Sequence, residues 1–219
     1  MKQSKLVGYL FGVAGMLMLS FTLIALKYGL ESFSPITMSL GRVFPAAIVA
    51  IIALRISGAP LLPPKQDVVR VLGLTIGLVI AFPLITSYGL EHITPGQAGV
   101  LGALGPIITA ALSVLYGHKH PGRVFWIASS MGTAAAIGFA LTRSADNPGH
   151  GDLLWYGLML IAVVLWCWGQ VTGGTLTGKH HSIQILAWAI LLGTPLNAIG
   201  AGVELWLNPI TEWPTMNAW

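Results

Sequence analysis

The chain carries very little charge and almost no cysteine. Only 8% of its 219 residues are charged, whereas about 25% are charged in a typical soluble domain. This charge is too small to cover a water-facing surface, which excludes a soluble globular protein. The single cysteine, Cys167, excludes an internal disulfide and a cysteine-rich metal site. Because Cys167 lies within an apolar stretch, we interpret it as a small core residue.

The basic residues are not arranged for nucleic-acid binding. Eleven Lys and Arg residues against seven Asp and Glu give a formal net charge of +4. They are scattered in small groups, and no nucleic-acid-binding motif accompanies them. We therefore expect no nucleic-acid partner. The excess of positive charge is instead typical of the cytoplasmic loops of a membrane protein.

Long apolar stretches fill most of the chain. A helix of about 20 apolar residues matches the roughly 30 Å hydrocarbon core of a bilayer. Within lipid, only helices or closed barrels satisfy their own backbone polar groups. We therefore predict an all-α integral membrane protein, a bundle of about seven transmembrane helices embedded in the lipid bilayer. The predicted spans are Leu6–Leu26, Pro35–Leu54, Val71–Leu90, Pro95–Leu115, Val124–Leu141, Leu153–Val171 and Ile183–Trp206.

Basic residues fall in every second gap between these spans. The side of the membrane that faces the cytoplasm carries the excess of Lys and Arg. The amino terminus is therefore predicted to be cytoplasmic, and the carboxyl terminus of this chain to lie outside the cell (inner) membrane. Only Lys27 and Arg143 fall on the outer side, and Arg42 lies inside a span. The predicted cytoplasmic set is Lys2, Lys5, Arg55, Lys65, Arg70, Lys119, Arg123 and Lys179.

Prolines and glycines interrupt the predicted helices. A proline within a helix frees a backbone carbonyl, and such helices are common where transporters face a cavity. Small residues four apart let helices approach closely, whereas a denser glycine run could also leave room for a ligand. The prolines are Pro45, Pro83, Pro106 and Pro195; the spaced pairs are Gly8/Gly12, Gly73/Gly77 and Ala134/Gly138; the run is Gly96, Gly99, Gly102 and Gly105.

A weak internal repeat relates the two ends of the chain. A shift of 147 residues overlays the first two spans on the sixth and seventh, so that Tyr9 meets Tyr156 and Phe21 meets Trp168. An odd number of helices separates the copies, which predicts that the second copy is inverted in the membrane. Inverted repeats are a recurring architecture of secondary transporters, with the substrate site between them.

Several motifs carry a resemblance to a known family. Phe21, Lys27, Pro35 and Arg42 follow one another across the first two spans. The turn at 88–95, Pro106 in the fourth span and Trp168-Gly169 in the sixth follow the same pattern. With these motifs the chain resembles the drug/metabolite transporter superfamily, EamA-type. The resemblance implies a first EamA-like repeat of five helices over residues 1–143 and a partial, inverted second repeat of two helices over 151–219.

Two departures from the family pattern stand out. The family has a Gly-Glu pair where this chain reads Gly117-His118-Lys119-His120, so any role of that Glu is not carried over. The family also has ten helices, and three of them have no counterpart here. We therefore expect either a truncated product or a second chain that completes the bundle.

The resemblance implies a transporter that exports small metabolites or drugs by alternating access, with a small-molecule substrate and no cofactor. Three alternatives stay open. The chain could be an inactive or partner-dependent fragment. A seven-helix receptor or retinal pump would need an outer amino terminus and, for retinal, a Lys in the last span. A membrane enzyme would need a nucleophile–base pair or a metal within the membrane, and neither is found.

Charged and aromatic residues at depth are the first candidates for the substrate pathway. Arg42 lies about 10 Å below the outer surface at helical rise, where a charge is costly unless it is paired or solvated. Instead of contacting a substrate, the Arg42 side chain could extend to the outer headgroups or pair with Glu31 or Glu91. Trp166 and Trp168 lie deep in the sixth span, although indoles favour the interface; simple packing is their alternative.

Uncharged polar residues complete the candidate pathway. Thr and Ser in such helices commonly bond their own backbone, which is the alternative to a role in an outer vestibule. No catalytic residue and no metal ligand is expected, because His118, His120, His180 and His181 fall in loops that nothing holds together. The polar candidates are Thr86, Ser87, Tyr88, Gln97, Gln170 and Asn197.

Overall fold

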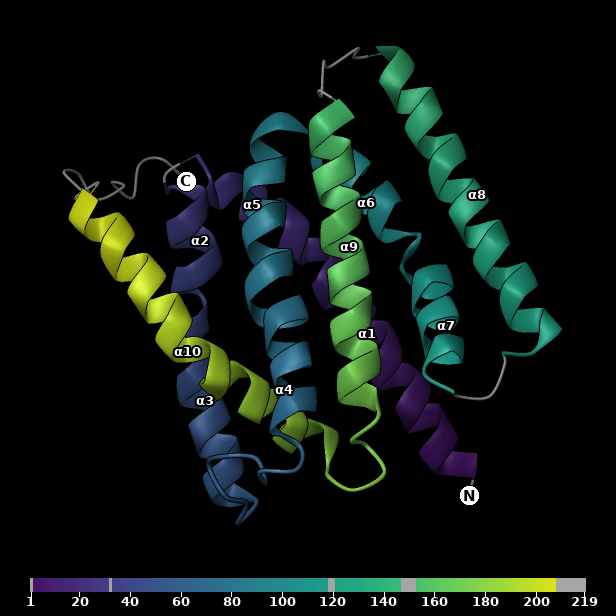
Figure 1. The fold of residues 1–219 in the computed structure, drawn as a ribbon. Helices are drawn as coiled ribbons and strands as arrows, with labels where there is room; N and C mark the ends of the chain where they lie inside the picture. Colours follow the sequence, from purple (N-terminus) through teal and green to yellow (C-terminus); the bar gives the residue numbers. More distant parts are fainter. Residues whose placement is uncertain (1, 32, 118–120, 147–152, 208–219) are drawn as a thin grey trace.

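The computed structural model describes residues 2–31, 33–117, 121–146 and 153–207, and all regular structure within them is helical (Figure 1). The chain runs up and down through the bundle (Figure 1). Elements that follow one another without a loop, such as α2 and α3, continue in one direction, and each such stretch runs opposite to the one before it (Figure 1). Their elements are α1 (Lys2–Gly29), α2 (Pro35–Gly41), α3 (Val43–Ile56), α4 (Val68–Leu74), the π-helix η1 (Thr75–Ala81), α5 (Phe82–His92), α6 (Pro95–Gly102), α7 (Gly105–Leu115), α8 (Arg123–Asp146), α9 (Leu153–Gly174) and α10 (Ser182–Leu207).

The predicted all-α membrane bundle is confirmed. Within the described residues, six helical stretches are long and apolar enough to cross a bilayer. The fifth predicted span is helical as α8 but is not among those six. The six stretches are Leu10–Gly29, Pro35–Ile56, Val68–His92, Pro95–Leu115, Leu154–Gly174 and Ser182–Glu204.

Three of the four interior prolines explain where the spans are interrupted. A proline lacks the N–H that would bond the carbonyl four residues earlier. The residue four before Pro45 is Gly41, where α2 ends, and the residue four before Pro106 is Gly102, where α6 ends. For Pro83 that residue lies within η1, where the Phe82 N–H bonds the carbonyl of Gly77 instead. By contrast, α10 continues through Pro195.

Glycines bring the third and sixth spans into backbone contact. A Cβ added to Gly169 of α9 would lie 3.2 Å from the Cα of Gly77 in η1, and one added to Gly77 would collide with the carbonyl oxygen of Leu165. One turn away, a Cβ on Gly73 would lie 3.0 Å from the Thr172 hydroxyl oxygen. The predicted helix contact at Gly73 and Gly77 is therefore confirmed. Such an approach is open only to residues without a side chain.

The other spaced pairs do not pack in this way. No atom lies within 4 Å of a Cβ built on Gly12 or Gly138, so the contacts predicted for those two motifs are wrong within the described structure. Gly8 lies outside the residues whose side chains are described. The reason is positional, because small residues permit close approach only where a neighbouring helix is present. Most of α1 is exposed, with only 6% of its apolar span buried.

The core has two parts. One cluster joins α3, α4, η1 and α10 around the buried side chains of Leu54, Val71 and Trp188. The second joins α1, α5, α6 and α9 around Leu90 and Met159. Lys27 at the end of α1 donates to the Leu90 carbonyl at 2.6 Å, so its charge meets a free carbonyl at the end of α5.

The connections alternate between the two ends of the bundle. The end that holds the amino terminus also holds the α3–α4 and α9–α10 connections, the last turn of α7 and the first turn of α8 (Figure 1). The other end holds the α5–α6 connection, the last turns of α1 and α8, and the first turns of α2 and α9 (Figure 1). The loop that contains Lys65 thus lies at the amino-terminal end of the bundle, whereas Lys119 lies outside the described residues. The direction of the bundle in a cell stays a prediction.

Candidate functional site

A cavity of about 650 Å³ lies among α7, α8 and α9, with Met16 of α1 at its edge. Its lining residues lie on α1, α6, α7, α8 and α9 or in the segments beside them, and α7 and α8 lie on the side of α9 away from α10 (Figure 1). The lining residues are Met16, Gly102, Ala103, Gly105, Pro106, Thr109, Ala110, Ser113, Pro121, Phe125, Trp166 and Gln170.

The cavity forms where the fourth span is broken. Because α6 ends at Gly102 and α7 begins at Gly105, the chain between them leaves the helix axis. The Ala103 carbonyl accepts a bond from the Thr133 hydroxyl of α8 at 3.0 Å, and the Cys167 thiol lies 3.5 Å from the Gly105 carbonyl. Side chains of α8 and α9 therefore bond backbone carbonyls at and beside the break, where a polar backbone group needs a partner within the membrane.

The floor of the cavity is aromatic and packed. Trp166 of α9 stacks on Phe82, with ring centroids 5.3 Å apart and an interplanar angle of 26°. A Cβ on Gly105 would lie 3.3 Å from the Trp166 ring, so the glycine allows the indole to reach the break. Phe82 and Gly105 thus contact the Trp166 indole, which also lines the cavity.

The walls carry no charge. Among the lining residues, Thr109, Ser113 and Gln170 are the polar side chains, and the others are apolar or glycine. A concave, mostly apolar pocket with a few polar groups is typical of small-molecule sites. This composition suits a neutral or weakly polar solute, because an ion would lose its hydration here without a paired charge.

Two of the predicted pathway residues meet at this cavity. Trp166 and Gln170, one turn apart on α9, both line it. Trp168 points elsewhere and donates from its indole nitrogen to the Tyr116 hydroxyl at 2.8 Å, which joins α9 to the end of α7. Cys167, between the two tryptophans, is fully buried, which confirms its interpretation as a core residue.

Three other predicted residues are buried in the bundle away from this cavity. Thr86 and Ser87 of α5 and Asn197 of α10 are each no more than 1% exposed. Within the described residues, the two hydroxyl oxygens and the Asn197 side-chain carbonyl oxygen have no hydrogen-bond partner. Self-bonding of Thr86 and Ser87 to their own helix is thus not found. The Asn197 amide nitrogen bonds the Gly193 carbonyl at 2.8 Å.

The remaining predicted residues lie apart from one another. Gln97 and Thr94 form a capping box at the start of α6, where the Gln97 side chain accepts from the Thr94 N–H at 2.8 Å. Arg42 is exposed at the break between α2 and α3, and it forms no ion pair with Glu31 or Glu91 in the described structure. Tyr88 is half-buried in α5. None of the three lines the cavity.

The cavity also contains residues that sequence reasoning missed. Thr109 and Ser113 lie one turn apart on α7, and Phe125 enters from α8. The available signal was the glycine run beside Pro106, since Gly102 and Gly105 both line the cavity and no atom lies within 4 Å of a Cβ built on Gly102. That run predicted room for a ligand but not which neighbouring side chains would surround it.

Comparisons with known proteins agree with this architecture. The model of the EamA-like transporter family matches residues 6–141. The chain belongs to the EamA-like transporter family. Over 195 residues it is 33% identical to the uncharacterized transporter YdeK of Bacillus subtilis, covering 86% of this chain and 64% of YdeK. No solved structure gives a significant match.

A second relative extends the family likeness. The uncharacterized inner membrane transporter YedA of Escherichia coli K12 is 27% identical over 177 residues, which cover 78% of this chain and 56% of YedA. This chain therefore spans less than two thirds of the length of either EamA-like relative. The matched range 6–141 includes α7 and most of α8, so two walls of the cavity belong to the EamA-like segment, and α9 supplies the third.

Proposed function

We propose that this chain forms part of a membrane carrier that holds a small, uncharged, largely apolar solute in the cavity among α7, α8 and α9. The cavity carries this proposal, because it combines a volume of about 650 Å³ with an aromatic floor and a few polar side chains. Family membership and the transporter names of YdeK and YedA support the transport activity.

The direction of transport is proposed to be export. The cavity reaches Pro121 and Phe125, beside the α7–α8 connection, at the end of the bundle that also holds the amino terminus (Figure 1). The distribution of Lys and Arg supports a cytoplasmic position for that end. A solute would therefore enter from the cytoplasm, and rocking of two inverted repeats would carry it outward by alternating access.

The complete transport unit is proposed to contain more helices than this chain. Of the apolar span of α1, 6% is buried, against 39% for Val68–His92 and for Ser182–Glu204. Helix faces that remain open to lipid at α1 and α8 are suitable for further helices, supplied by a second chain or by a longer product. A chain without such helices would be an inactive or partner-dependent fragment, the alternative already drawn from the sequence.

Transport in vesicles tests the proposal, first with the purified chain and then with the chain joined to the helices found in longer relatives. We expect uptake or efflux of a neutral aromatic amphiphile and none of its permanently charged analogue. Trp166→Ala and Gln170→Leu should each reduce the rate, whereas Trp206→Ala should not, because Trp206 is 82% exposed and lies outside the cavity. Equal rates for all three variants would contradict the assignment of the site.

A longer protein that contains this chain and further helices distinguishes a part of a larger carrier from an inactive fragment. If this chain is inactive but gains transport when the helices found in longer relatives are joined to it, the cavity is part of a larger carrier. If neither form transports a solute that binds, the proposed function is wrong.

A further inference from the structure

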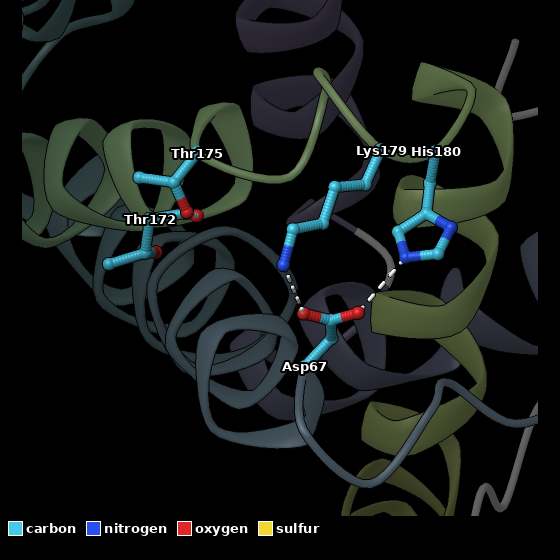
Figure 2. Close-up of polar contacts among 5 residues, drawn as sticks. All are labelled: Asp67, Thr172, Thr175, Lys179 and His180. Atoms are coloured by element: carbon cyan, nitrogen blue, oxygen red, sulfur yellow. Dashed lines mark hydrogen bonds and ion pairs between the residues drawn. The ribbon is translucent and has the colours of Figure 1, made fainter.

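Two connections that are far apart in the sequence are joined by a buried carboxylate. Asp67 precedes α4 and is only 1% exposed. Its Oδ2 lies 3.0 Å from Nε2 of His180, and its Oδ1 lies 3.9 Å from Nζ of Lys179, both in the α9–α10 connection (Figure 2). The expectation that nothing holds the loop histidines in place is therefore wrong for His180.

Asp67 is not used by its own helix. It occupies the N-cap position of α4, where an Asp side chain commonly accepts backbone N–H bonds, yet it makes no such side-chain bond. Its side chain instead turns toward the α9–α10 connection (Figure 2). Burial of a carboxylate is costly unless a partner compensates it, so this position depends on His180 and Lys179 being present.

The two threonine hydroxyls drawn with this group donate to backbone carbonyls and not to Asp67. Thr172 and Thr175 lie at the end of α9 (Figure 2), and their hydroxyls donate within that helix end, to the Gly169 and Thr172 carbonyls at 2.8 and 2.7 Å. Lys179 is 55% exposed and His180 is 20% exposed, so Asp67 is the buried member of the group.

Trp188 of α10 adds a second link from the later part of the chain to the α3–α4 connection. Its indole nitrogen donates to the Pro60 carbonyl at 2.8 Å, in the connection between α3 and α4. The ring of His180 stands edge-on to it at 5.0 Å and 80°. Trp188 is 1% exposed and belongs to the core cluster that joins α3, α4, η1 and α10. The His180 ring therefore packs against a side chain that the core holds in place.

The two connections belong to different predicted repeats. Asp67 and Pro60 lie in the repeat predicted over 1–143, and Lys179, His180 and Trp188 lie in the one predicted over 151–219. The helix that carries the α9–α10 connection also carries Trp166 and Gln170, which line the cavity. A shift of the end of α9 would therefore move both the contact with Asp67 and one wall of the cavity.

We propose that Asp67, Lys179 and His180 form an ionic latch that holds the two repeats together at the amino-terminal end of the bundle. The latch keeps this end closed between α4 and α10 and opens when the cavity changes the side to which it is accessible. This inference rests on the proposed carrier function, because a static protein would not need the contact to open.

A cysteine reporter under the latch measures its opening. Leu176 is fully buried, and its carbonyl accepts the N–H groups of Lys179 and His180. Leu176→Cys in a Cys167→Ala background places one thiol there, and N-ethylmaleimide labels it in membrane vesicles only when this end opens. Asp67→Asn and His180→Gln should each raise the labelling rate about tenfold, as loss of one charge-assisted bond does to an opening equilibrium.

Three further variants make the result specific. The double variant Asp67→Asn/His180→Gln should label no faster than the faster single variant, because both remove the same contact. The exchanged pair Asp67→His/His180→Asp should lower the rate again. Lys65→Gln removes a charge from the same connection, at an exposed position that forms no ion pair within the described residues, and should leave the rate unchanged.

The outcomes separate this inference from the proposed function. Additive effects, no recovery in the exchanged pair, or equal rates for Asp67→Asn and Lys65→Gln would overturn the latch. Thermal unfolding of each variant shows whether faster labelling reflects global unfolding, which would also overturn it. Labelling requires no substrate, so it can be measured whether or not the protein transports. If the variants show the expected labelling rates but no form of the protein transports a solute, the carrier function is wrong and the contact between the repeats still stands.

Discussion

Gly77 of η1 and Gly169 of α9 meet backbone to backbone, with the Gly77 Cα 3.2 Å from the site of a Cβ on Gly169. This crossing joins the segment matched by the EamA-like family model to a helix beyond it. The same helix α9 lines the cavity and leads to the latch. Close glycine contacts of this kind fix the spacing of membrane helices.

Gly77→Ala should destabilise the protein. The new methyl group would collide with the Leu165 carbonyl, a backbone atom that cannot turn away, and overpacking of this kind costs about 1–3 kcal/mol. Thermal unfolding of the detergent-solubilised protein, followed by size-exclusion chromatography, measures the loss. Gly99→Ala is the matched control, because no atom lies within 4 Å of its Cβ position. Equal unfolding temperatures for the two variants would show that the crossing is looser than described.

Gly102→Leu should block the cavity without loss of stability. Gly102 lines the cavity and has open space at its Cβ position, so the leucine side chain would occupy volume that a solute needs. Gly99→Leu provides the comparison one turn earlier, in open space but outside the cavity. Transport in vesicles should be lost in the first variant and retained in the second. Retention in both would place the solute elsewhere.

The orientation of the bundle can be tested by labelling from outside the cell. Cys167 is fully buried, so the native thiol gives little background. Lys65→Cys should resist a membrane-impermeant maleimide in intact cells, and Glu91→Cys should react, since the two exposed positions lie near opposite ends (Figure 1). The reverse pattern would place the amino terminus outside and would remove the argument for export.

Thr94→Ala should loosen the start of α6. Thr94 and Gln97 bond reciprocally there, with distances of 3.3 Å from the Gln97 N–H to the Thr94 hydroxyl and 2.8 Å for the return bond. Loss of such a cap costs about 0.5–2 kcal/mol. The unfolding temperature should fall, and Thr94→Ser should restore it. An unchanged temperature would mean that water at this exposed helix end replaces the cap fully.

The spans and their interruptions were largely predictable. Apolar length predicted helices close to those observed, and a proline four residues after Gly41 and Gly102 marks the points where α2 and α6 end. Both depend on local rules, namely helix length against bilayer thickness and the missing proline N–H. Pro195 shows the limit of the second rule, since α10 continues through it.

The membership of the site was predictable only in part. Trp166 and Gln170 line the cavity, whereas Gln97 caps a helix and Trp168 bonds Tyr116. Depth along a span can be counted from the sequence, but the direction in which a side chain points depends on how each helix is rotated against its neighbours. Thr109 and Ser113 were missed because hydroxyl residues are common in membrane helices and carry no distinctive signal.

The sequence by itself determined that this chain is a bundle of membrane helices and where most of those helices bend, because hydrophobic length and proline chemistry act within a single segment. Only the tertiary structure decided which glycines touch, which side chains surround the cavity, and that Asp67 meets His180 across 113 positions. Those facts depend on the packing of segments distant in the sequence, where a glycine or a buried carboxylate acquires its role from the atoms placed opposite it.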